Sequence, residues 1–330
     1  MNNLRVGVVG VGYLGKFHAE KYARLEGVDL VGVADTDPTA AEAVAQKYDT
    51  RAFADYNDLI GAVDAVSVVV PTPLHFTISR DFLASGADVL IEKPITTTLE
   101  EADELIRMAE DRGLLIQVGH LERFNPAVVA LDGKIHNPRF IESHRLSVYQ
   151  ERGTDVSVVL DLMIHDIDII LSFVRSEVTS IHAAGVPVIS GQVDIANTRL
   201  EFKNGCVANV TASRISNRTE RKIRLFQRDA YISVDFANHE ITLIHQTESG
   251  TDALLPGMER EQMCFTKSDA LDDEIRAFIR AVRRREPPEV TGTMGRNALQ
   301  VALSIMDQIS VTSRQLAGSS FDHFSTYPDR

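Results

Sequence analysis

LRVGVVGVGYLGKFHAEKYARL, residues 4–25, is the stretch that decides the fold of the first part of this chain. Residues 4–9 are mostly apolar, as in a buried strand, and residues 16–25 have the composition of a helix. Between them GVGYLG, residues 10–15, matches a G-x-G-x-x-G turn. In such a turn the first glycine makes the bend, the second lets the backbone approach a pyrophosphate, and the third allows close packing of helix on strand. The free N–H groups of the following helix can bind phosphates, so this order predicts a dinucleotide-binding unit.

A second apolar strand, residues 28–34, ends at Asp35, about 20 residues beyond the glycine turn. A carboxylate at this position can accept hydrogen bonds from both hydroxyls of an adenosine ribose and would repel a 2′-phosphate. No arginine follows it directly to neutralise such a phosphate. The pattern therefore favours NAD over NADP as the cofactor. The alternative is that Asp35 only caps the next helix, because aspartate is common before a turn that contains proline.

Strands and helices alternate as far as about residue 120. The strands are continuous apolar runs, which is typical of a parallel sheet with helices on both faces. With right-handed crossovers the result is a doubly wound α/β sheet, which predicts a dinucleotide-binding Rossmann domain over residues 1–120. Strands are expected at 4–9, 28–34, 65–70, 88–92 and 114–119, and helices at 16–25, 40–48, 77–85 and 100–112.

Residues 121–330 follow a different pattern and are expected to form a second domain. Residues 180–244 contain stretches of alternating apolar and polar residues joined by short turns, which predicts antiparallel strands with one face covered. Helices on either side of this region make it an α+β domain. These helices are expected near Pro126 and at 156–174, 269–285 and 296–316.

Composition limits the possible partners. At 330 residues and 44% hydrophobic, the chain can form two domains with real cores. A formal net charge of −13 argues against nucleic acid or an anionic membrane surface as a partner. Two cysteines, Cys206 and Cys264, are too few for a disulfide framework or a cysteine metal site. With no signal peptide and no apolar run of about 20 residues, we expect a soluble cytoplasmic protein.

Ligands of an open parallel sheet bind beyond the C-terminal ends of its strands. Two of these ends carry unusual residues, PTPLH at 71–75 and EKP at 92–94. Lys93 directly follows a buried strand, so its ammonium is expected to point into the crevice, where partial burial lowers a lysine pKa and prepares it for acid–base work. The alternative is a solvated loop lysine. The residues expected to contact the cofactor are Gly10, Gly12, Tyr13, Leu14, Gly15, Asp35, Pro71, Thr72, His75, Glu92 and Lys93.

The predicted helix 156–174 carries one polar stripe on an otherwise apolar surface. Asp161, His165 and Asp168 are spaced i, i+4 and i+7, which places them on one face of an α-helix. Because unpaired buried polar groups are costly, this stripe needs a partner. One interpretation is an acid–base pair in which Asp161 orients the His165 imidazole. The other is a core histidine, with Asp166 and Asp168 bonded to nearby backbone. A metal is not expected, because one helix supplies all three groups and no fourth ligand is evident.

The order of these motifs resembles the glucose–fructose oxidoreductase/inositol dehydrogenase/MocA (Gfo/Idh/MocA) family over nearly the whole chain. The shared features are the glycine turn, EKP at 92–94 and D-x-x-x-H across Asp161 and His165. The resemblance implies that Lys93, Asp161 and His165 are catalytic. It also implies a Rossmann domain followed by an α+β domain of residues 121–330, whose open, mostly antiparallel sheet builds homodimers or homotetramers. The nicotinamide would then lie between the domains.

VGHLERFNPA at 118–127 and RGTDV at 152–156 resemble the branch of this family that includes UDP-N-acetylglucosamine 3-dehydrogenases. The resemblance implies oxidation of the 3-hydroxyl of a UDP-N-acetylhexosamine. The residues expected to contact such a substrate are Arg123, Asn125, Arg152, Asp161, His165 and Arg214. Basic residues at 218–228 could add attraction for an anion. As alternatives, Arg123 and Arg152 pair with carboxylates at the domain interface, and the basic strand is a solvated sheet face.

The expected reaction is removal of hydride and a proton from a secondary hydroxyl. His165 would accept the hydroxyl proton, Lys93 would hydrogen-bond the developing alkoxide, and Asp161 would hold the imidazole tautomer. One alternative is a dehydrogenase of a free sugar, polyol or cyclitol such as myo-inositol. A second is a non-catalytic dinucleotide sensor on the same fold. Lys93 and His165 argue against a sensor, since it needs no acid–base pair.

Overall fold

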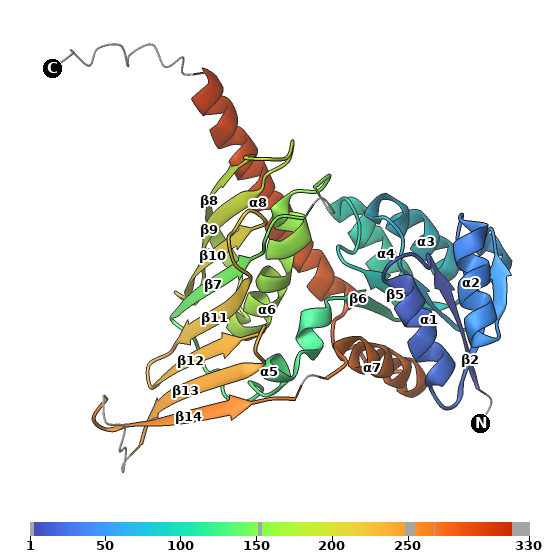
Figure 1. Ribbon diagram of the computed structural model, residues 1–330, viewed down its shortest axis with the longest axis horizontal. Helices are drawn as coiled ribbons and strands as arrows, with labels where there is room; N and C mark the ends of the chain where they lie inside the picture. Colours follow the sequence, from blue (N-terminus) through green and yellow to red (C-terminus); the bar gives the residue numbers. More distant parts are fainter. Residues whose placement is uncertain (1–2, 151–153, 248–254, 267, 319–330) are drawn as a thin grey trace.

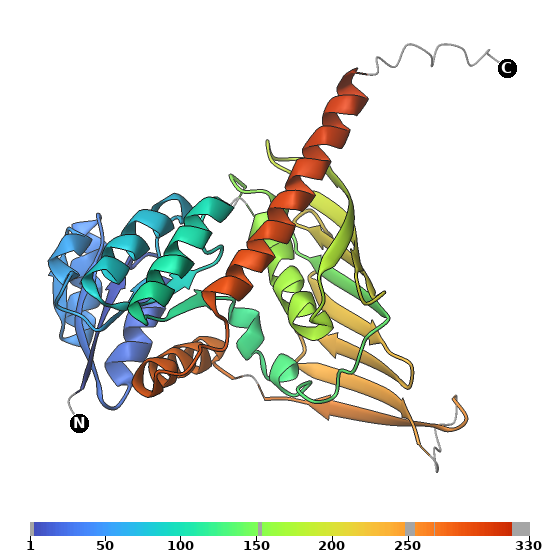
Figure 2. The ribbon, with the colours of Figure 1, turned by 180° about the vertical axis from the view of Figure 1, so that it is seen from behind.

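The computed structural model describes residues 3–150, 154–247, 255–266 and 268–318. It has two lobes, each built on one β-sheet, with the N-terminal sheet and the larger C-terminal sheet at opposite sides of Figure 1. The long helix α8 (Gly292–Gly318) starts between the lobes and runs along the C-terminal sheet, as the reverse view in Figure 2 shows. No helix in the described part of the chain is long and apolar enough to cross a bilayer.

The first sheet is parallel throughout, with strand order β3-β2-β1-β4-β5-β6. The order reverses between β1 and β4, which confirms the doubly wound fold and sets a ligand-binding switch point there. The strands are β1 (Leu4–Val9), β2 (Val28–Ala34), β3 (Arg51–Phe53), β4 (Ala65–Val68), β5 (Asp88–Glu92) and β6 (Ile116–Gly119). The helices are α1 (Gly15–Arg24), α2 (Pro38–Tyr48), α3 (His75–Ser85) and α4 (Leu99–Arg112).

The predicted strands of this lobe are confirmed, with small differences at their ends. β4 ends at Val68 and β6 begins at Ile116, so the predicted ranges 65–70 and 114–119 were too long. β3 was not predicted, because an edge strand of three residues is too short to show a pattern.

The second sheet has eight strands in the order β14-β13-β12-β11-β7-β10-β9-β8, all antiparallel except the pair β7 and β10. This confirms an open, mostly antiparallel sheet. The strands are β7 (Phe140–Leu146), β8 (Val178–Val186), β9 (Ile195–Phe202), β10 (Val207–Ser213), β11 (Glu220–Phe226), β12 (Ala230–Asp235), β13 (Glu240–Gln246) and β14 (Met258–Cys264). β7 was not predicted, because Ser143 and Arg145 occupy two of its buried positions and hide the alternation of apolar residues.

One face of this sheet packs against α8 and α6 (Ile164–Val174) around a large apolar core. The opposite face carries side chains that are half-exposed, among them the aromatic row Phe140, Phe226 and Tyr231. That this face joins copies of the chain stays a prediction.

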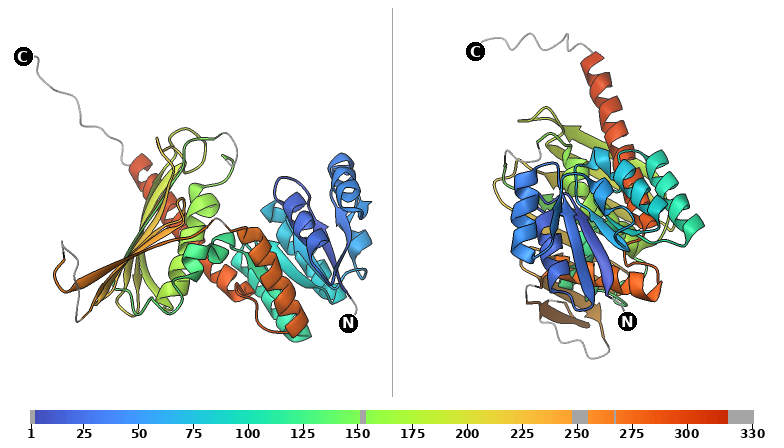
Figure 3. Two further views of the ribbon diagram at one scale, coloured as in Figure 1. Left: turned by 60° about the horizontal axis from the view of Figure 1, so that its bottom comes forward. Right: turned by 90° about the vertical axis from the view of Figure 1, so that its right-hand side faces the viewer.

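The helix α7 (Ala270–Arg284) returns to the first lobe and packs beside α1, as Figure 3 shows. Its buried side chains Ile275 and Phe278 join Val6 and Val8 of β1 in one apolar cluster. The expected helix 269–285 therefore exists, but it covers the N-terminal sheet. The division into domains at residues 1–120 and 121–330 stays a prediction. The short helix α5 (Pro126–Val129) lies where a helix was expected near Pro126.

The predicted helix 156–174 is not one continuous α-helix. Residues Val159–Met163 form the π-helical turn η4, and α6 starts only at Ile164. A π turn has a wider hydrogen-bond spacing than an α turn, so it rotates the residues that follow. Asp161 therefore lies on the π turn and His165 on the α-helix that follows it, which corrects the prediction of one continuous α-helix over 156–174.

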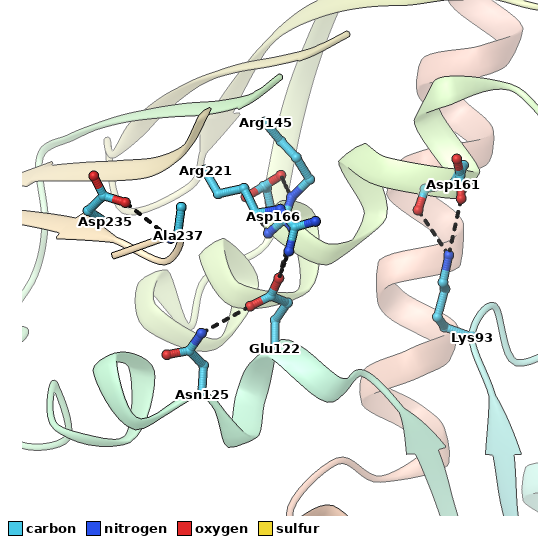
Figure 4. A network of polar contacts seen from close by, with 9 residues as sticks. All are labelled: Lys93, Glu122, Asn125, Arg145, Asp161, Asp166, Arg221, Asp235 and Ala237. Carbon is cyan, nitrogen blue, oxygen red and sulfur yellow. Dashed lines mark hydrogen bonds and ion pairs between the residues drawn. The ribbon is translucent and has the colours of Figure 1, made fainter. Parts of the chain in front are cut away.

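A buried ionic network ties β7 to α6 and to the turn η3 (Leu121–Phe124), as Figure 4 shows. Arg145 donates from Nε and Nη2 to the two carboxylate oxygens of Asp166, at 2.7 and 3.2 Å, and from Nη1 to Oε1 of Glu122 at 2.9 Å. Burial lowers the pKa of Arg145, but the carboxylates of Asp166 and Glu122 outweigh it and raise that pKa above its usual value. Arg221 lies 3.7 Å from the same Glu122 oxygen.

We expect Arg145→Met to lower the free energy of unfolding by about 3–5 kcal/mol, because it leaves two buried carboxylates without their cation. The measurement is urea-induced unfolding. Arg199→Met is the matched control, since Arg199 pairs with Glu201 at 3.0 Å on the exposed face of the sheet. That control should cost less than about 1 kcal/mol. Equal stability of the two variants would contradict the structural role of the network.

Candidate active site

The glycine turn fits a dinucleotide pyrophosphate. Gly10 has a φ of +84°, and a Cβ at Gly15 would overlap the carbonyl of Gly10, so both positions require glycine. Gly12 is exposed, and within the described chain a Cβ there would meet no atom closer than 4 Å. The first turn of α1 holds no acidic residue and no capping side chain among the described residues, although the N–H of Phe17 already donates to the carbonyl of Leu14 at 2.9 Å. Tyr13 is 66% exposed and Leu14 is half-buried.

Asp35 lies beside this turn. Its Oδ2 accepts a hydrogen bond from the backbone N–H of Val11 at 2.7 Å, and its Oδ1 accepts one from the N–H of Asp37 at 2.9 Å. The cap of α2 is Asp37, whose side chain accepts from the N–H of Thr39. The alternative that Asp35 only caps a helix is therefore wrong. A half-buried carboxylate at the end of β2, next to the turn, has the position expected of a ribose acceptor.

His75 is buried, and its ring nitrogens are used within the protein. Nδ1 bonds the carbonyl of Pro94 at 2.9 Å and Nε2 bonds the carbonyl of Val70 at 2.8 Å. These bonds hold together the loops that follow β4 and β5, and burial lowers the pKa of the ring. Both ring nitrogens are therefore engaged within the protein, and contact of His75 with a cofactor stays a prediction. Pro71 is exposed and Thr72 is half-buried in the same loop, so both can still face a ligand.

Glu92 and Lys93 point in different directions from the end of β5. The Glu92 carboxylate lies 3.3 Å from Nε2 of buried His18 and packs so closely on Gly119 that a Cβ there would meet it at 2.9 Å. Lys93 extends toward the second lobe. Its Nζ donates to the backbone carbonyl of Asp161 at 2.9 Å and lies 3.7 Å from the Asp161 carboxylate, as Figure 4 shows. The crevice predicted for this ammonium is thus the junction of the two lobes.

The environment of Lys93 makes its ammonium easier to deprotonate than that of a solvated lysine. Burial lowers the pKa of Lys93, and the carboxylates of Asp161 and Glu92 offset only part of that effect. A lysine with a lowered pKa can exchange a proton near neutral pH more easily than a solvated one. The hydrogen bond to the main-chain carbonyl of Asp161 also holds the ammonium in one place.

His165 lies one residue into α6, with its side chain half-buried. Burial lowers the pKa of His165 well below its usual value, and the positive charge of Lys93 lowers it further. The imidazole is therefore neutral at pH 7 and able to accept a proton. Its Nδ1 is buried without a hydrogen-bond partner among the described residues.

Asp161 does not orient this imidazole as expected. Its carboxylate faces Lys93 at 3.7 Å and Arg214 at 4.0 Å, and the described residues show no hydrogen bond between Asp161 and His165. Asp161 lies on the π turn η4, and its main-chain carbonyl also accepts the hydrogen bond of Lys93. Asp161 serves instead as the anion between two cations, one from each lobe.

The described residues expected to contact the substrate are buried or half-buried and have partners within the protein. Arg123 is half-buried and lies 3.7 Å from Asp168, and Asn125 is buried and caps α5 by accepting from the N–H of Ala127. Arg214 is 5% exposed and donates to the carbonyl of Val156. Arg152 lies outside the described residues. Arg123 thus fits the alternative in which it pairs with a carboxylate instead of the substrate.

The polar core residues and the basic strand also have partners. Asp166 and Asp168 pair with arginines and not with nearby backbone. Basic side chains of β11 pair with carboxylates, Lys222 with Asp235 at 3.2 Å and Arg224 with Glu142 at 3.5 Å. This region therefore offers less free positive charge than the sequence suggests.

His120 lies beside His165, although the sequence motifs did not indicate it as part of this site. It follows directly after β6 and its ring centroid lies 6.4 Å from that of His165, with the rings nearly perpendicular at 88°. The signal that could have found it is its position at the C-terminal end of a parallel strand, which is the same rule that identified Lys93.

Together these residues are suited to acid–base chemistry near the dinucleotide-binding turn. A neutral imidazole, a lysine of lowered pKa and a carboxylate meet where the two lobes join. This set can remove a proton from a hydroxyl and stabilise the oxygen anion that results.

Two family models match the chain in succession. The model described as the oxidoreductase family with an NAD-binding Rossmann fold matches residues 4–120, and the model of the Gfo/Idh/MocA C-terminal domain matches residues 127–233. These matches cover the first sheet and the greater part of the second.

Known relatives agree with these models. UDP-N-acetylglucosamine 3-dehydrogenase of Acidithiobacillus ferrooxidans is 39% identical over 306 residues, 92% of this chain and 97% of the relative. A solved structure of that enzyme superimposes with a TM-score of 0.90 at 38% identity, covering 94% of this chain and 99% of the other. The NAD-dependent scyllo-inositol 2-dehydrogenase of Bacillus subtilis is 26% identical over 327 residues, 92% of this chain and 93% of the relative. The chain therefore belongs to the Gfo/Idh/MocA family of NAD-binding oxidoreductases.

Proposed function

We propose that this oxidoreductase uses NAD to oxidise the 3-hydroxyl of a UDP-N-acetylhexosamine, with Lys93, Asp161 and His165 as its catalytic residues. The observation that carries the proposal is the contact of the Lys93 ammonium with Asp161, four residues before His165. It brings a cation of the dinucleotide-binding lobe to the helix that holds the neutral imidazole. The similarity of the whole chain to UDP-N-acetylglucosamine 3-dehydrogenase of Acidithiobacillus ferrooxidans supports the choice of substrate.

The protein's own groups move the proton and hold the charge. When bound, the nicotinamide supplies the hydride acceptor. His165 takes the proton of the substrate hydroxyl, which it can do because its lowered pKa keeps it neutral. Lys93 donates a hydrogen bond to the oxygen as negative charge develops there. Asp161 keeps the Lys93 ammonium at the junction of the lobes and balances its charge.

We expect Lys93→Ala and His165→Asn each to reduce kcat by about 10²–10⁴-fold, because each removes positioned acid–base help. The assay follows NADH absorbance with UDP-N-acetylglucosamine as substrate. Binding of NADH, measured by its fluorescence, should stay near the native value in both variants. Lys203→Ala and His182→Asn make the same changes at exposed residues of the second lobe and should keep native turnover. Near-native kcat in either site variant would refute the role of that residue.

Ligand-dependent stabilisation tests the class of substrate. In the presence of NAD, UDP-N-acetylglucosamine at a hundredfold its Kd should add about 2.7 kcal/mol to the free energy of unfolding. Free N-acetylglucosamine, myo-inositol and scyllo-inositol should add much less at the same concentration. Thermal unfolding provides the measurement. Stabilisation by an inositol and not by the nucleotide sugar would instead favour a cyclitol dehydrogenase.

We infer a preference for NAD over NADP from the position of Asp35. Asp35→Ser should lower the ratio of NADH affinity to NADPH affinity by about tenfold or more, because it removes the charge that repels a 2′-phosphate. The affinities come from fluorescence titration. Asp37→Ser is the matched control, since serine still caps α2, and it should leave the ratio unchanged. A native enzyme that binds NADPH as tightly as NADH would contradict the inference.

A further inference from the structure

Arginines surround a surface hollow of about 550 Å³ in the N-terminal lobe, where α7 lies beside the end of α1. Its lining includes five of them, which are Arg24, Arg276, Arg280, Arg283 and Arg284. Among the described residues that line this arginine hollow, Glu26 is the only acidic one. Positive charge is therefore concentrated at one place on a chain whose formal net charge is −13.

The arginine hollow is separate from the candidate active site. Arg24 is the last residue of α1, whereas the glycine turn comes before the first residues of that helix. Ten helical residues span about 15 Å, so the hollow and the expected pyrophosphate position lie at opposite ends of α1. The proposed reaction uses none of these arginines.

The spacing of the arginines on α7 places like charges side by side. Arg276, Arg280 and Arg284 follow one another at intervals of four residues. Residues at this spacing are neighbours on a helix surface, and like charges there destabilise the helix. The helix dipole favours cations only in the last turn, which accounts for Arg284 but not for Arg276 or Arg280. An anion held between these side chains would offset their repulsion.

The carboxylate partners of the arginines lie outside the hollow. Four of the five arginines form ion pairs, Arg24 with Glu20, Arg276 with Asp272, Arg280 with Glu289 and Arg284 with Glu286. None of these four carboxylates is among the residues that line the hollow. Arg276 bonds its partner through Nε alone and Arg280 through Nη2 alone within the described part of the chain. Because a guanidinium has five N–H donors, each keeps donors for a further anion, and exposed ion pairs of this kind are weak.

Arg283 is held at the hollow by the main chain. Its Nη2 donates to the carbonyl of Glu26 at 3.2 Å and to the carbonyl of Gly27 at 2.7 Å. The guanidinium packs so closely on Gly27 that a Cβ there would meet Nη2 at 2.5 Å. Arg283 has no ion pair with a carboxylate of the described residues, so its charge is fixed in place without a counter-charge.

We propose that the arginine hollow binds a small anion that carries phosphate groups, held by Arg276, Arg280 and Arg283. Guanidinium groups form paired, charge-assisted hydrogen bonds with phosphate oxygens. The volume of the hollow is within the range of small-molecule sites. This inference concerns a second site and does not depend on the substrate proposed above.

Inorganic pyrophosphate is the probe for this site. The full-length protein is saturated with NADH, so that the glycine turn is occupied, and binding is measured by isothermal titration calorimetry. The double variant Arg276→Gln/Arg280→Gln should bind pyrophosphate about tenfold more weakly or worse, because it removes two charged donors. Arg199→Gln/Lys203→Gln removes the same charge from exposed residues of the second lobe and should bind as the native protein does. Native affinity for NADH in both double variants shows that they are folded.

Three results would overturn the proposal. One is the absence of pyrophosphate binding to the native protein. Another is binding that Arg276→Gln/Arg280→Gln retains, which would place the anion elsewhere, as in the substrate site. The third is tighter binding of a short polyglutamate peptide than of pyrophosphate, lost in the same variant, which would assign the hollow to an acidic protein segment instead.

Discussion

The contact between the Lys93 ammonium and Asp161 is the interaction on which the site depends. Lys93 belongs to the end of β5 in one lobe, and Asp161 to the π turn before α6 in the other. A buried ammonium needs an acceptor and a counter-charge, and Asp161 supplies both through its main-chain carbonyl and its carboxylate. The contact therefore joins the proposed reacting groups of the two lobes directly. The same burial that makes the contact necessary also lowers the pKa of Lys93.

The second lobe holds its half of the site by a separate ionic network. Arg145 on β7 binds Asp166 on α6 and Glu122 after β6, so one guanidinium joins the sheet, the helix and the connection between the lobes. A buried ionic network of this kind adds little to the free energy of unfolding compared with apolar packing. Removing one of its partners is costly, because it leaves a charge buried without a counter-charge. Here the network fixes the position of α6 on the sheet, and Asp166 is adjacent to His165 in that helix. The buried cation also helps to keep His165 neutral.

Several residues that the sequence suggests as ligand contacts have partners within the protein. His75 joins two loops through backbone carbonyls, and Asn125 caps a short helix. Arg123 lies close to Asp168. Each stands next to a motif that is proposed to bind or react, so position in sequence could not separate them. Only the hydrogen-bond partners of each side chain distinguish a residue that faces a ligand from one that supports it.

The sequence by itself determined the first lobe, because a glycine turn and apolar parallel strands are local patterns that few folds can use. It also identified Lys93, since the end of a parallel strand is a known place for ligands. The tertiary structure alone decided how the second half of the site is arranged. Asp161 lies on the π turn at Val159–Met163, and its main-chain carbonyl and carboxylate face Lys93 of the other lobe. The nearness of His120 to His165 joins residues 45 positions apart, a relation that no local pattern of residues contains.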